Sequence, residues 1–153
     1  MRIGQAGLQL ITEFEDLKLK SYRDIAGVWT IGYGTTRING ISVSSGMEIN
    51  ETVALALLEG DLSHFTYLVS KAAIYSLTQN QFDALVSFAY NIGEAAFTSS
   101  SLLQSLNHKL EINEDLFTRW NKYTDPLTKQ KLTSNGLTRR RKAEYALFIS
   151  REA

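Results

Sequence analysis

Residues 15–34 of this 153-residue chain read EDLKLKSYRDIAGVWTIGYG, and this stretch decides the fold that we predict. Its second half alternates the large residues Trp29, Ile31 and Tyr33 with small ones, which is the period-two pattern of a β-strand. The large residues share one face and can pack against a core. The small residues on the other face are expected to leave room beside the strand.

A turn signal extends this strand into a ribbon. Asn39-Gly40 stands between Ile38 and Ile41, and both central residues tolerate the positive φ angles of a tight hairpin turn. We therefore expect a small antiparallel β-ribbon over residues 21–43.

Helical patterns flank the predicted ribbon. Apolar residues three apart predict a helix over residues 7–19, with Glu15 near its C-terminal end. Everything after Gly46 is expected to be helical. Asn50 is predicted to cap a long helix that runs to about Ala72. The apolar side of that helix is predicted to consist of Val53, Leu57, Leu58, Leu62, Phe65 and Val69.

The later helices complete the predicted architecture. Thr78 and Gln81 fit a capping box, and Gly93 is expected to close the helix that follows. Shorter helices are predicted at about residues 99–108, 113–122 and 137–150. The fold class is therefore α+β and mainly helical, with an N-terminal helix and a small antiparallel ribbon joined by a long helix to a helical lobe. Residues 1–153 form one domain in this prediction, with a ribbon lobe over about 1–50, a connecting helix over about 51–72 and a helical lobe over about 73–153.

Composition excludes several classes of protein. Hydrophobic residues make up 44% of the chain and charged residues 21%, which is too apolar for a disordered protein. Cysteine is absent, so the chain has no disulfide framework and no thiolate nucleophile. The two histidines, His64 and His108, give little material for a metal site or a Ser-His-Asp triad. We expect no cofactor and no metal.

Charge is balanced overall but uneven along the chain. Lys and Arg total 16, as do Asp and Glu, whereas residues 119–153 hold nine basic and three acidic residues. Such a segment indicates first a solvated face and second an anion-binding surface. Nucleic acid is not expected as a partner, because no binding motif accompanies the basic residues. The sequence shows neither a signal peptide nor a transmembrane span, so synthesis in a cytoplasm is expected.

Three polar residues in the opening stretch suggest chemistry. Glu15 stands at a helix end, Asp24 in the first turn of the ribbon, and Thr30 on the small-residue face of the strand. Two carboxylates that face a gap can flank a glycosidic bond, one as the acid and one to handle water. Spacing alone leaves simpler alternatives open, since Asp24 also suits a turn cap before Gly27 and Thr30 suits an ordinary strand.

These residues also carry a resemblance to a known family. Glu15, Tyr22-Arg23-Asp24 and the run from Thr30 to Gly34 resemble the signature of the phage-type lysozymes of glycoside hydrolase family 24, with the same spacing from Glu to Asp to Thr. Later blocks, at residues 77–88, 119–122 and 136–141, follow in the family's order. The resemblance covers nearly the whole chain.

The resemblance implies a muramidase that hydrolyses the β-1,4 bond between N-acetylmuramic acid and N-acetylglucosamine in peptidoglycan. Glu15 would be the general acid, a role for which partial burial against Phe14 and Leu17 is expected to help keep the carboxyl protonated. Asp24 and Thr30 would position water and steady the developing positive charge. Inversion of configuration is implied, which predicts a carboxylate separation of about 6.5–9.5 Å.

The resemblance further implies substrate-binding roles for Tyr90, Ser101 and Arg140, and it places Arg140 beside the catalytic glutamate. Tyr90 suits a core position equally well, and Arg139 stands one residue from the aligned arginine. Two residues depart from the family pattern. Asp16 replaces the usual Gly, and Thr35 replaces the usual His, a change expected to affect stability and pH dependence more than chemistry.

The biological role follows from the same resemblance. A phage endolysin would stay in the host cytoplasm until a holin-type lesion releases it to the wall, and it would make no stable membrane insertion. A monomer is expected, because the sequence shows no heptad pattern and no exposed apolar strip. A lytic transglycosylase and an inactive wall-binding homologue are the alternatives. The intact set of Glu15, Asp24 and Thr30 argues against both.

Overall fold

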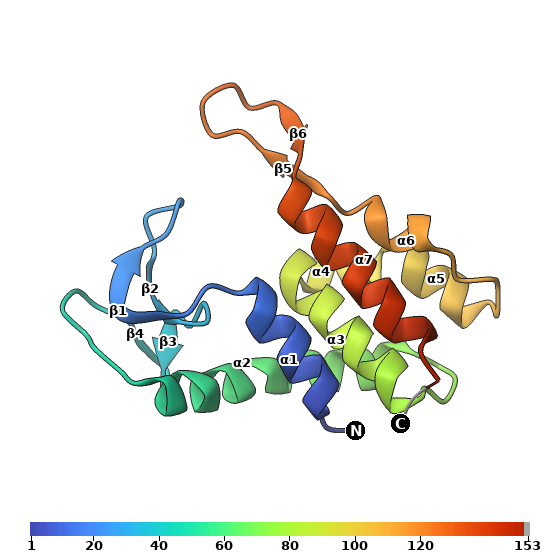
Figure 1. Cartoon of the computed structure of the whole chain (residues 1–153), viewed down its shortest axis with the longest axis horizontal. Coiled ribbons are helices and arrows are strands. Elements are labelled where there is room, and N and C mark those ends of the chain that lie inside the picture. The colour runs from blue at the N-terminus through green and yellow to red at the C-terminus, as the bar shows by residue number, and fades with distance from the viewer. Residues whose placement is uncertain (152–153) are drawn as a thin grey trace. The chain divides into compact units, whose positions relative to one another are not determined.

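A computed structural model describes residues 1–151, which form seven helices and three two-stranded antiparallel sheets (Figure 1). The α+β, mainly helical fold class is confirmed. In chain order the elements are α1 (Gln5–Phe14), β1 (Lys18–Arg23), β2 (Trp29–Gly32), β3 (Arg37–Ile38), β4 (Ile41–Ser42), α2 (Glu51–Ala72), α3 (Gln79–Ile92), α4 (Glu94–Thr98), α5 (Ser101–Asn107), α6 (Glu114–Thr118), β5 (Lys122–Thr124), β6 (Lys131–Thr133) and α7 (Asn135–Ile149).

The chain divides into two compact units. Residues 1–10 join the chain from Phe65 onward in the first unit, and residues 11–64 form the second. The boundary falls inside α1 and inside α2, so both helices contribute residues to each unit. The lobe limits predicted near residues 50 and 72 stay a prediction. No helix within residues 1–151 combines the length and apolar character needed to span a bilayer.

The second unit contains the ribbon, which begins earlier than predicted. Strand β1 pairs with β2, and the register shifts between Lys18 and Tyr22. Helix α1 ends at Phe14, so the prediction of a helix through residue 19 was wrong. The Glu15 N–H donates to the Ile11 carbonyl at 2.9 Å, and the chain then extends to pair with β2. Strand pairing therefore overrides the helical periodicity beyond Glu15.

The small-residue face of β2 is packed, contrary to expectation. Thr30 is only 3% exposed, and Gly32 lies against helix α2. A Cβ added to Gly32 would lie 3.4 Å from both the Ala54 Cβ and the Ile49 Cδ1. The glycine therefore allows a close approach of backbone and helix. The second hairpin, β3–β4, is confirmed, with positive φ angles of 52° at Asn39 and 78° at Gly40.

The long helix α2 has the predicted bounds and cap, since Asn50 Oδ1 accepts from the Val53 N–H at 2.8 Å. Leu58, Leu62 and Val69 are fully buried as predicted, but Val53 is 40% exposed. Ala54 occupies the buried position of that first turn instead.

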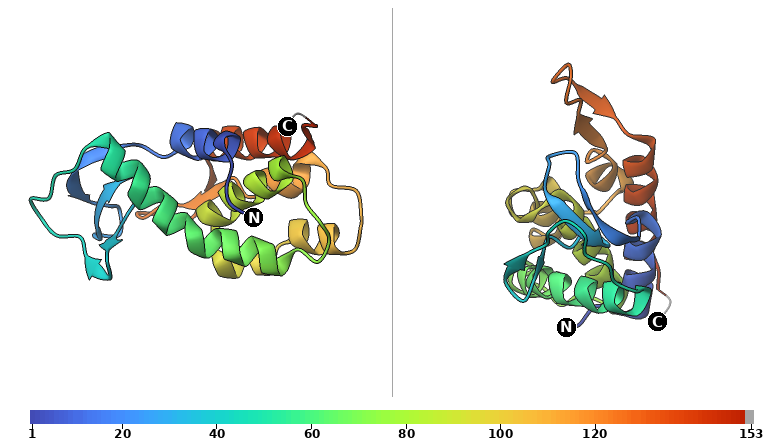
Figure 2. Two further views of the ribbon diagram at one scale, coloured as in Figure 1. Left: turned by 90° about the horizontal axis from the view of Figure 1, so that it is seen from below. Right: turned by 90° about the vertical axis from the view of Figure 1, so that its left-hand side faces the viewer.

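The first unit has its core around α3, whose capping box between Thr78 and Gln81 is confirmed. Residues 82–89 are all buried, and α3 lies beside α7 (Figures 1 and 2). The ring of Phe88 makes edge-on contacts with Phe97, Phe117 and Trp120. This aromatic cluster fixes the C-terminal half of α3 against the surrounding helices.

The C-terminal third differs from the all-helical expectation. The helix predicted over residues 99–108 is α5, which spans Ser101–Asn107, and α4 precedes it. The helix predicted over residues 113–122 ends at Thr118, and the hairpin β5–β6 follows. All six residues of the two strands are exposed. Because neither face of the hairpin is buried, no alternation of buried apolar residues marks it in the sequence. Helix α7 matches the predicted helix at residues 137–150 within two residues.

Candidate active site

The three predicted catalytic residues all belong to the second unit. Glu15 directly follows α1 and is partly buried, as are Phe14 and Leu17. The backbone bond from Glu15 to Ile11 closes the last turn of α1 and fixes the position of its Cα. The neighbouring Asp16 is exposed. Glu15 thus stands near the C-terminal end of the helix, as the sequence predicts, although the helix ends and the ribbon begins earlier than predicted.

Asp24 organises the turn between β1 and β2. Its Oδ1 accepts from the backbone N–H groups of Ala26 and Val28, at 2.9 and 2.8 Å. Gly27 has a φ of 82°, which the turn requires. The simpler interpretation of Asp24 as a turn cap is therefore correct, yet it occupies only one oxygen. Among residues 1–151, the other oxygen, Oδ2, accepts no hydrogen bond.

Thr30 is held on the ribbon by its own hydroxyl. Its Oγ1 donates to the Val28 carbonyl at 2.9 Å, and its Cα pairs with that of Tyr22 across the strands. Because the hydroxyl proton points to Val28, the lone pairs of Oγ1 remain available to accept a hydrogen bond. Asp24 and Thr30 therefore both carry a rigidly placed acceptor oxygen.

Tyr22 connects the predicted residues electrostatically. Burial raises the pKa of its phenol, and the negative charges of Asp24, Glu15 and Asp16 raise it further. These effects mean that three carboxylates lie within electrostatic range of one phenol. Tyr22 belongs to the Tyr22-Arg23-Asp24 motif, and nothing in the sequence assigns it a role beyond that motif.

Thr35, the departure from the family pattern, keeps a polar contact. Its Oγ1 donates to Asp61 Oδ2 of α2 at 2.7 Å, and Thr35 is 1% exposed. Two backbone hydrogen bonds of 2.9 Å join Thr35 to Ile31, which follows Thr30. Burial raises the pKa of Asp61, while the hydrogen bond from Thr35 lowers it. The hydroxyl of Thr35 is thus the hydrogen-bond donor to the half-buried carboxyl of Asp61.

Two predicted substrate-binding residues lie in the first unit. Tyr90 is partly buried on α3 and meets Phe65 edge-on at 5.4 Å between ring centroids. Ser101 is exposed at the start of α5, and its Oγ accepts from Arg119 Nη1 at 3.1 Å. Their roles at a substrate stay predictions.

Arg140, the third, belongs to a buried ionic cluster of the first unit. Arg140 Nε and Arg141 Nε approach the two carboxylate oxygens of Glu144 at 3.3 and 2.7 Å. Ser87 of α3 donates to Glu144 Oε2 at 2.6 Å. Burial raises the pKa of Glu144, against the opposing effects of Arg141, Arg140 and Ser87. The cluster joins α7 to α3, and the pairing of Arg140 with Glu15 stays a prediction.

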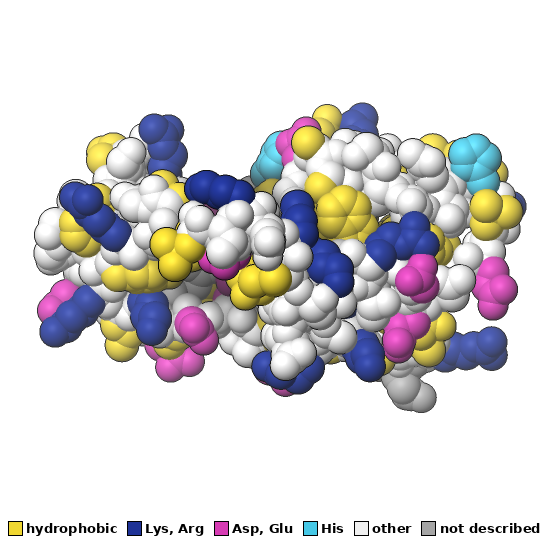
Figure 3. All heavy atoms as spheres, turned by 90° about the horizontal axis from the view of Figure 1, so that it is seen from above, with side chains coloured by type: hydrophobic (Ala, Val, Ile, Leu, Met, Phe, Trp, Pro, Cys, Tyr) yellow, Lys and Arg dark blue, Asp and Glu magenta, His cyan; other side chains and the backbone are white. Residues whose placement is uncertain are grey.

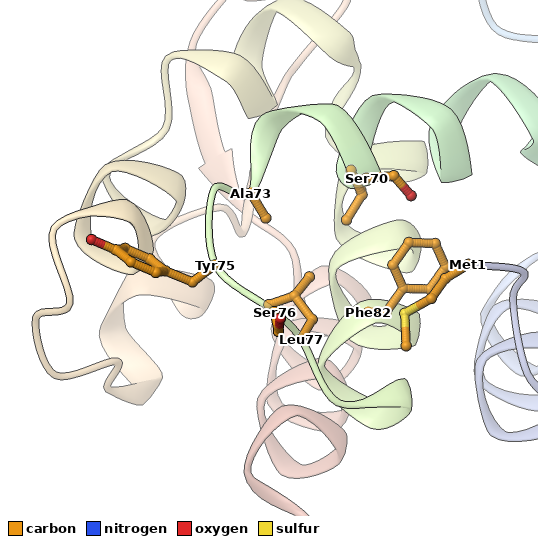
Figure 4. Close-up of a pocket in the computed structure, with 8 residues that line it drawn as sticks. Met1, Ser70, Ala73, Tyr75, Ser76, Leu77 and Phe82 are labelled. Atoms are coloured by element: carbon orange, nitrogen blue, oxygen red, sulfur yellow. The ribbon is translucent and has the colours of Figure 1, made fainter.

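The first unit contains cavities. One, of about 230 Å³, is lined mostly by apolar side chains, and Figure 4 shows Met1 beside Phe82 in its wall. A second, of about 500 Å³, has three basic residues in its wall: Arg119, Lys122 and Lys131. No group of three metal-ligating side chains occurs among residues 1–151.

Comparisons with known proteins agree on one family. The family model described as phage lysozyme matches residues 12–144. The endolysin of Bacillus phage PZA is 44% identical over 153 residues, which is 98% of this chain and 56% of that protein. The chain thus spans just over half the length of that relative.

Two solved structures have the same fold over nearly their full length. An endolysin from the Escherichia coli O157:H7 phage FAHEc1 has a TM-score of 0.90 and 41% identity, covering 97% of this chain and 94% of that one. The muramidase domain of SpmX from Asticaccaulis excentricus has a TM-score of 0.88 and 35% identity, covering 97% and 98%.

Proposed function

Because the chain belongs to the phage lysozyme family, we propose that it is an endolysin that cleaves peptidoglycan as a muramidase. The bond cleaved is the β-1,4 linkage between N-acetylmuramic acid and N-acetylglucosamine. One observation supports the assignment of this activity to individual residues. Tyr22 pairs with Thr30, and the negative charges of Asp24 and Glu15 raise the pKa of its phenol, which supports a common site for the three motif residues.

In this mechanism Glu15 donates its proton to the glycosidic oxygen as the bond to the muramic acid C1 breaks. Water attacks C1 from the opposite side. Asp24 Oδ2 accepts a proton from that water, while Oδ1 stays bonded to the turn. Thr30 Oγ1 accepts a hydrogen bond from the second O–H of that water, which stays intact and becomes the new C1 hydroxyl, because the Thr30 hydroxyl donates its own hydrogen bond to the Val28 carbonyl. The result is inversion at C1. Inverting enzymes place their two carboxyl groups about 6.5–9.5 Å apart, and this is the separation that we expect between Glu15 and Asp24.

The biological setting is part of the same proposal. A monomeric enzyme accumulates in the host cytoplasm and reaches the wall through a separate holin-type lesion, which leads to host lysis. Fractionation of expressing cells checks this order of events, since periplasmic activity without a holin would contradict it.

Digestion of purified peptidoglycan, followed by mass spectrometry, tests the chemistry. The parent protein is expected to release muropeptides with hydrated reducing ends. Glu15→Gln should lower the rate by about 10²–10⁴-fold, because the amide has no proton to donate to the leaving oxygen. Glu13→Gln, which changes an exposed carboxylate on α1, is the matched control and should leave the rate unchanged.

Each other outcome has a defined meaning. Anhydro products from the parent would make the protein a lytic transglycosylase. An active Glu15→Gln variant would refute the role of Glu15. No product from a folded parent protein would leave an inactive wall-binding homologue.

A further inference from the structure

Tyr22 lies on the same face of the ribbon as Thr30. The Cα atoms of the two residues are paired across β1 and β2, so their side chains share one face. The next pair, Arg23 and Trp29, belongs to the opposite face, where the Arg23 guanidinium stands 5.1 Å from the centroid of the indole ring. The contact between Arg23 and Trp29 supports the division of the ribbon into two faces.

Asp24 continues this pattern by one residue. Its backbone N–H donates to the Val28 carbonyl at 2.9 Å, so the pairing of the two chain segments extends just beyond β1. Because side chains alternate along an extended chain, Asp24 leaves the backbone on the same side as Tyr22. Tyr22 thus shares a face with the two acceptor atoms of the proposed mechanism, Asp24 Oδ2 and Thr30 Oγ1.

The phenol of Tyr22 is an unused hydrogen-bond donor. The side chain is partly buried, yet its hydroxyl makes no hydrogen bond within residues 1–151. Tyrosine hydroxyls that are removed from solvent usually have a partner. Burial and the negative charges of Asp24, Glu15 and Asp16 raise the pKa of this phenol, so the hydroxyl keeps its proton at neutral pH.

The attacking water of the proposed mechanism lacks a donor. Its two O–H groups point to Asp24 Oδ2 and Thr30 Oγ1, both of which only accept. Two hydrogen bonds let the water rock about the line that joins the two acceptors, whereas a third bond, received from a donor, removes this freedom. The oxygen then keeps one lone pair for the sugar C1 and uses the other for the donor.

We propose that Tyr22 is a further catalytic residue, which donates its phenol O–H to the attacking water while Asp24 and Thr30 accept from it. This role rests on the proposed function. Tyr22 transfers no proton, because its O–H stays intact while the water gives one proton to Asp24 and bonds to C1. A donor withdraws some electron density from the water. Orientation outweighs that cost, since a misplacement of about 1 Å can lower a rate about 10²-fold.

The kinetics of glycan cleavage by Tyr22→Phe test this role, because the change removes only the hydroxyl. We expect kcat to fall about tenfold and KM to change less than about twofold, since the water and not the sugar loses a contact. The midpoint of thermal unfolding should stay the same. Tyr67→Phe, which removes an exposed phenol hydroxyl on α2, is the matched control and should leave both constants unchanged.

A double-mutant cycle with Thr30→Val asks whether the two hydroxyls act on the same water. If they do, the double variant should lose less rate than the product of the two single losses, because residues that share a partner are not additive. Losses that multiply would overturn the proposal. So would a raised KM at constant kcat in Tyr22→Phe, which would make Tyr22 a contact of the sugar.

The placement of the phenol can be measured without turnover. The chain has seven tyrosines, so ¹³C-labelled tyrosine gives seven ring signals, of which Tyr22→Phe assigns one. Asp24→Asn should move the titration of Tyr22 to lower pH, because a negative charge that raises the pKa of the phenol is lost. The titration of Tyr67 should not move. A Tyr22 signal that does not respond would contradict the placement of the phenol beside Asp24.

The outcomes keep this inference apart from the proposed function. A folded parent protein that cleaves no glycan would refute the proposed function and remove the water step with it. An active parent protein whose kcat is unchanged in Tyr22→Phe would refute the role of Tyr22 alone.

Discussion

Thr35 donates a partly buried hydrogen bond from the ribbon to helix α2. Its hydroxyl reaches Asp61 from a position that is 1% exposed, and its backbone bonds to Ile31 close the turn after Thr30. Thr35→Val keeps the shape but removes the donor. We expect it to lower the free energy of unfolding by about 1–3 kcal/mol at pH 7, measured by urea denaturation. Thr35→Ser, which keeps the hydroxyl, should lose less.

The effect of Thr35→Val should also depend on pH, with a definite sign. The pKa of Asp61 is raised in the folded state, so its titration favours folding at low pH, and this contribution is lost as pH rises through the folded pKa. The hydrogen bond from Thr35 lowers that pKa and so limits the loss. Removing the hydroxyl should therefore cost more at pH 7 than at pH 3. An equal cost at both values would show that Asp61 does not mediate the effect.

Residue-level chemistry was partly predictable. The cap formed by Asp24 and the burial of Thr30 among strand residues both matched the simpler interpretations of those positions, and neither excludes a catalytic role. Asp61 could not be foreseen, because the sequence gives no signal that α2 passes the turn at Thr35. The grouping of Lys122 and Lys131 at one pocket was missed for a related reason, since it depends on the unpredicted β5–β6 hairpin.

Among the elements, α1 depends on a distant side chain for its N-terminal cap. Asp83 of α3 is fully buried and accepts from the backbone N–H groups of Gly4 and Gly7, at 2.9 and 3.1 Å. A Cβ on Gly7 would lie 2.8 Å from the Asp83 Cβ and Cγ and from the Ile3 Cγ1. Both glycines therefore allow α1 to approach α3 closely enough to be capped.

Gly7→Ala tests this dependence, and Gly60, which has no neighbouring atom where a Cβ would lie, serves for comparison. The clash with Asp83 should destabilise the protein by about 1–3 kcal/mol despite the higher helix propensity of alanine. Gly60→Ala on α2 meets open space and should instead stabilise by up to about 1 kcal/mol. Thermal unfolding of both variants measures the contrast. Stabilisation by Gly7→Ala would show that α1 does not need this close approach.

Whether an element can be predicted depends on how far apart in the sequence the residues that form it lie. The capping box of Thr78 and Gln81 and the Asn39-Gly40 turn each involve residues no more than three positions apart in the sequence, and both were predicted correctly. The end of α1 depends on pairing between β1 and β2, and the hairpin β5–β6 carries no buried face. Local periodicity holds no information on either feature.

At the scale of the whole molecule, balanced charge conceals an uneven surface. The basic excess of residues 119–153 includes Arg140 and Arg141, yet both are buried with Glu144 and add little to the surface field. Arg139 and Lys142, by contrast, are exposed. On the face that Figure 3 shows, basic side chains are interspersed with acidic and neutral ones. The run of residues 139–142 thus combines two surface cations with two structural ones.

Because two of these cations are exposed and two are buried, substitutions at neighbouring positions should have different effects, one on wall binding and the other on stability. Neutralising the exposed pair with Arg139→Gln and Lys142→Gln should weaken binding to purified peptidoglycan and make it less sensitive to salt, because screened surface charges are lost. Arg140→Gln should instead destabilise the fold by about 3 kcal/mol or more, because it breaks a buried ion pair. Sedimentation with sacculi at several salt concentrations, combined with urea denaturation, separates the two effects.

The matched control for the exposed pair is Arg2→Gln with Lys71→Gln, which removes two exposed charges outside the basic segment. If the segment itself contacts the wall, this control should weaken binding less than the change at Arg139 and Lys142. Equal losses from both double variants would mean that only the net charge of the protein matters. The basic segment would then be an ordinary solvated face, as the sequence first indicated.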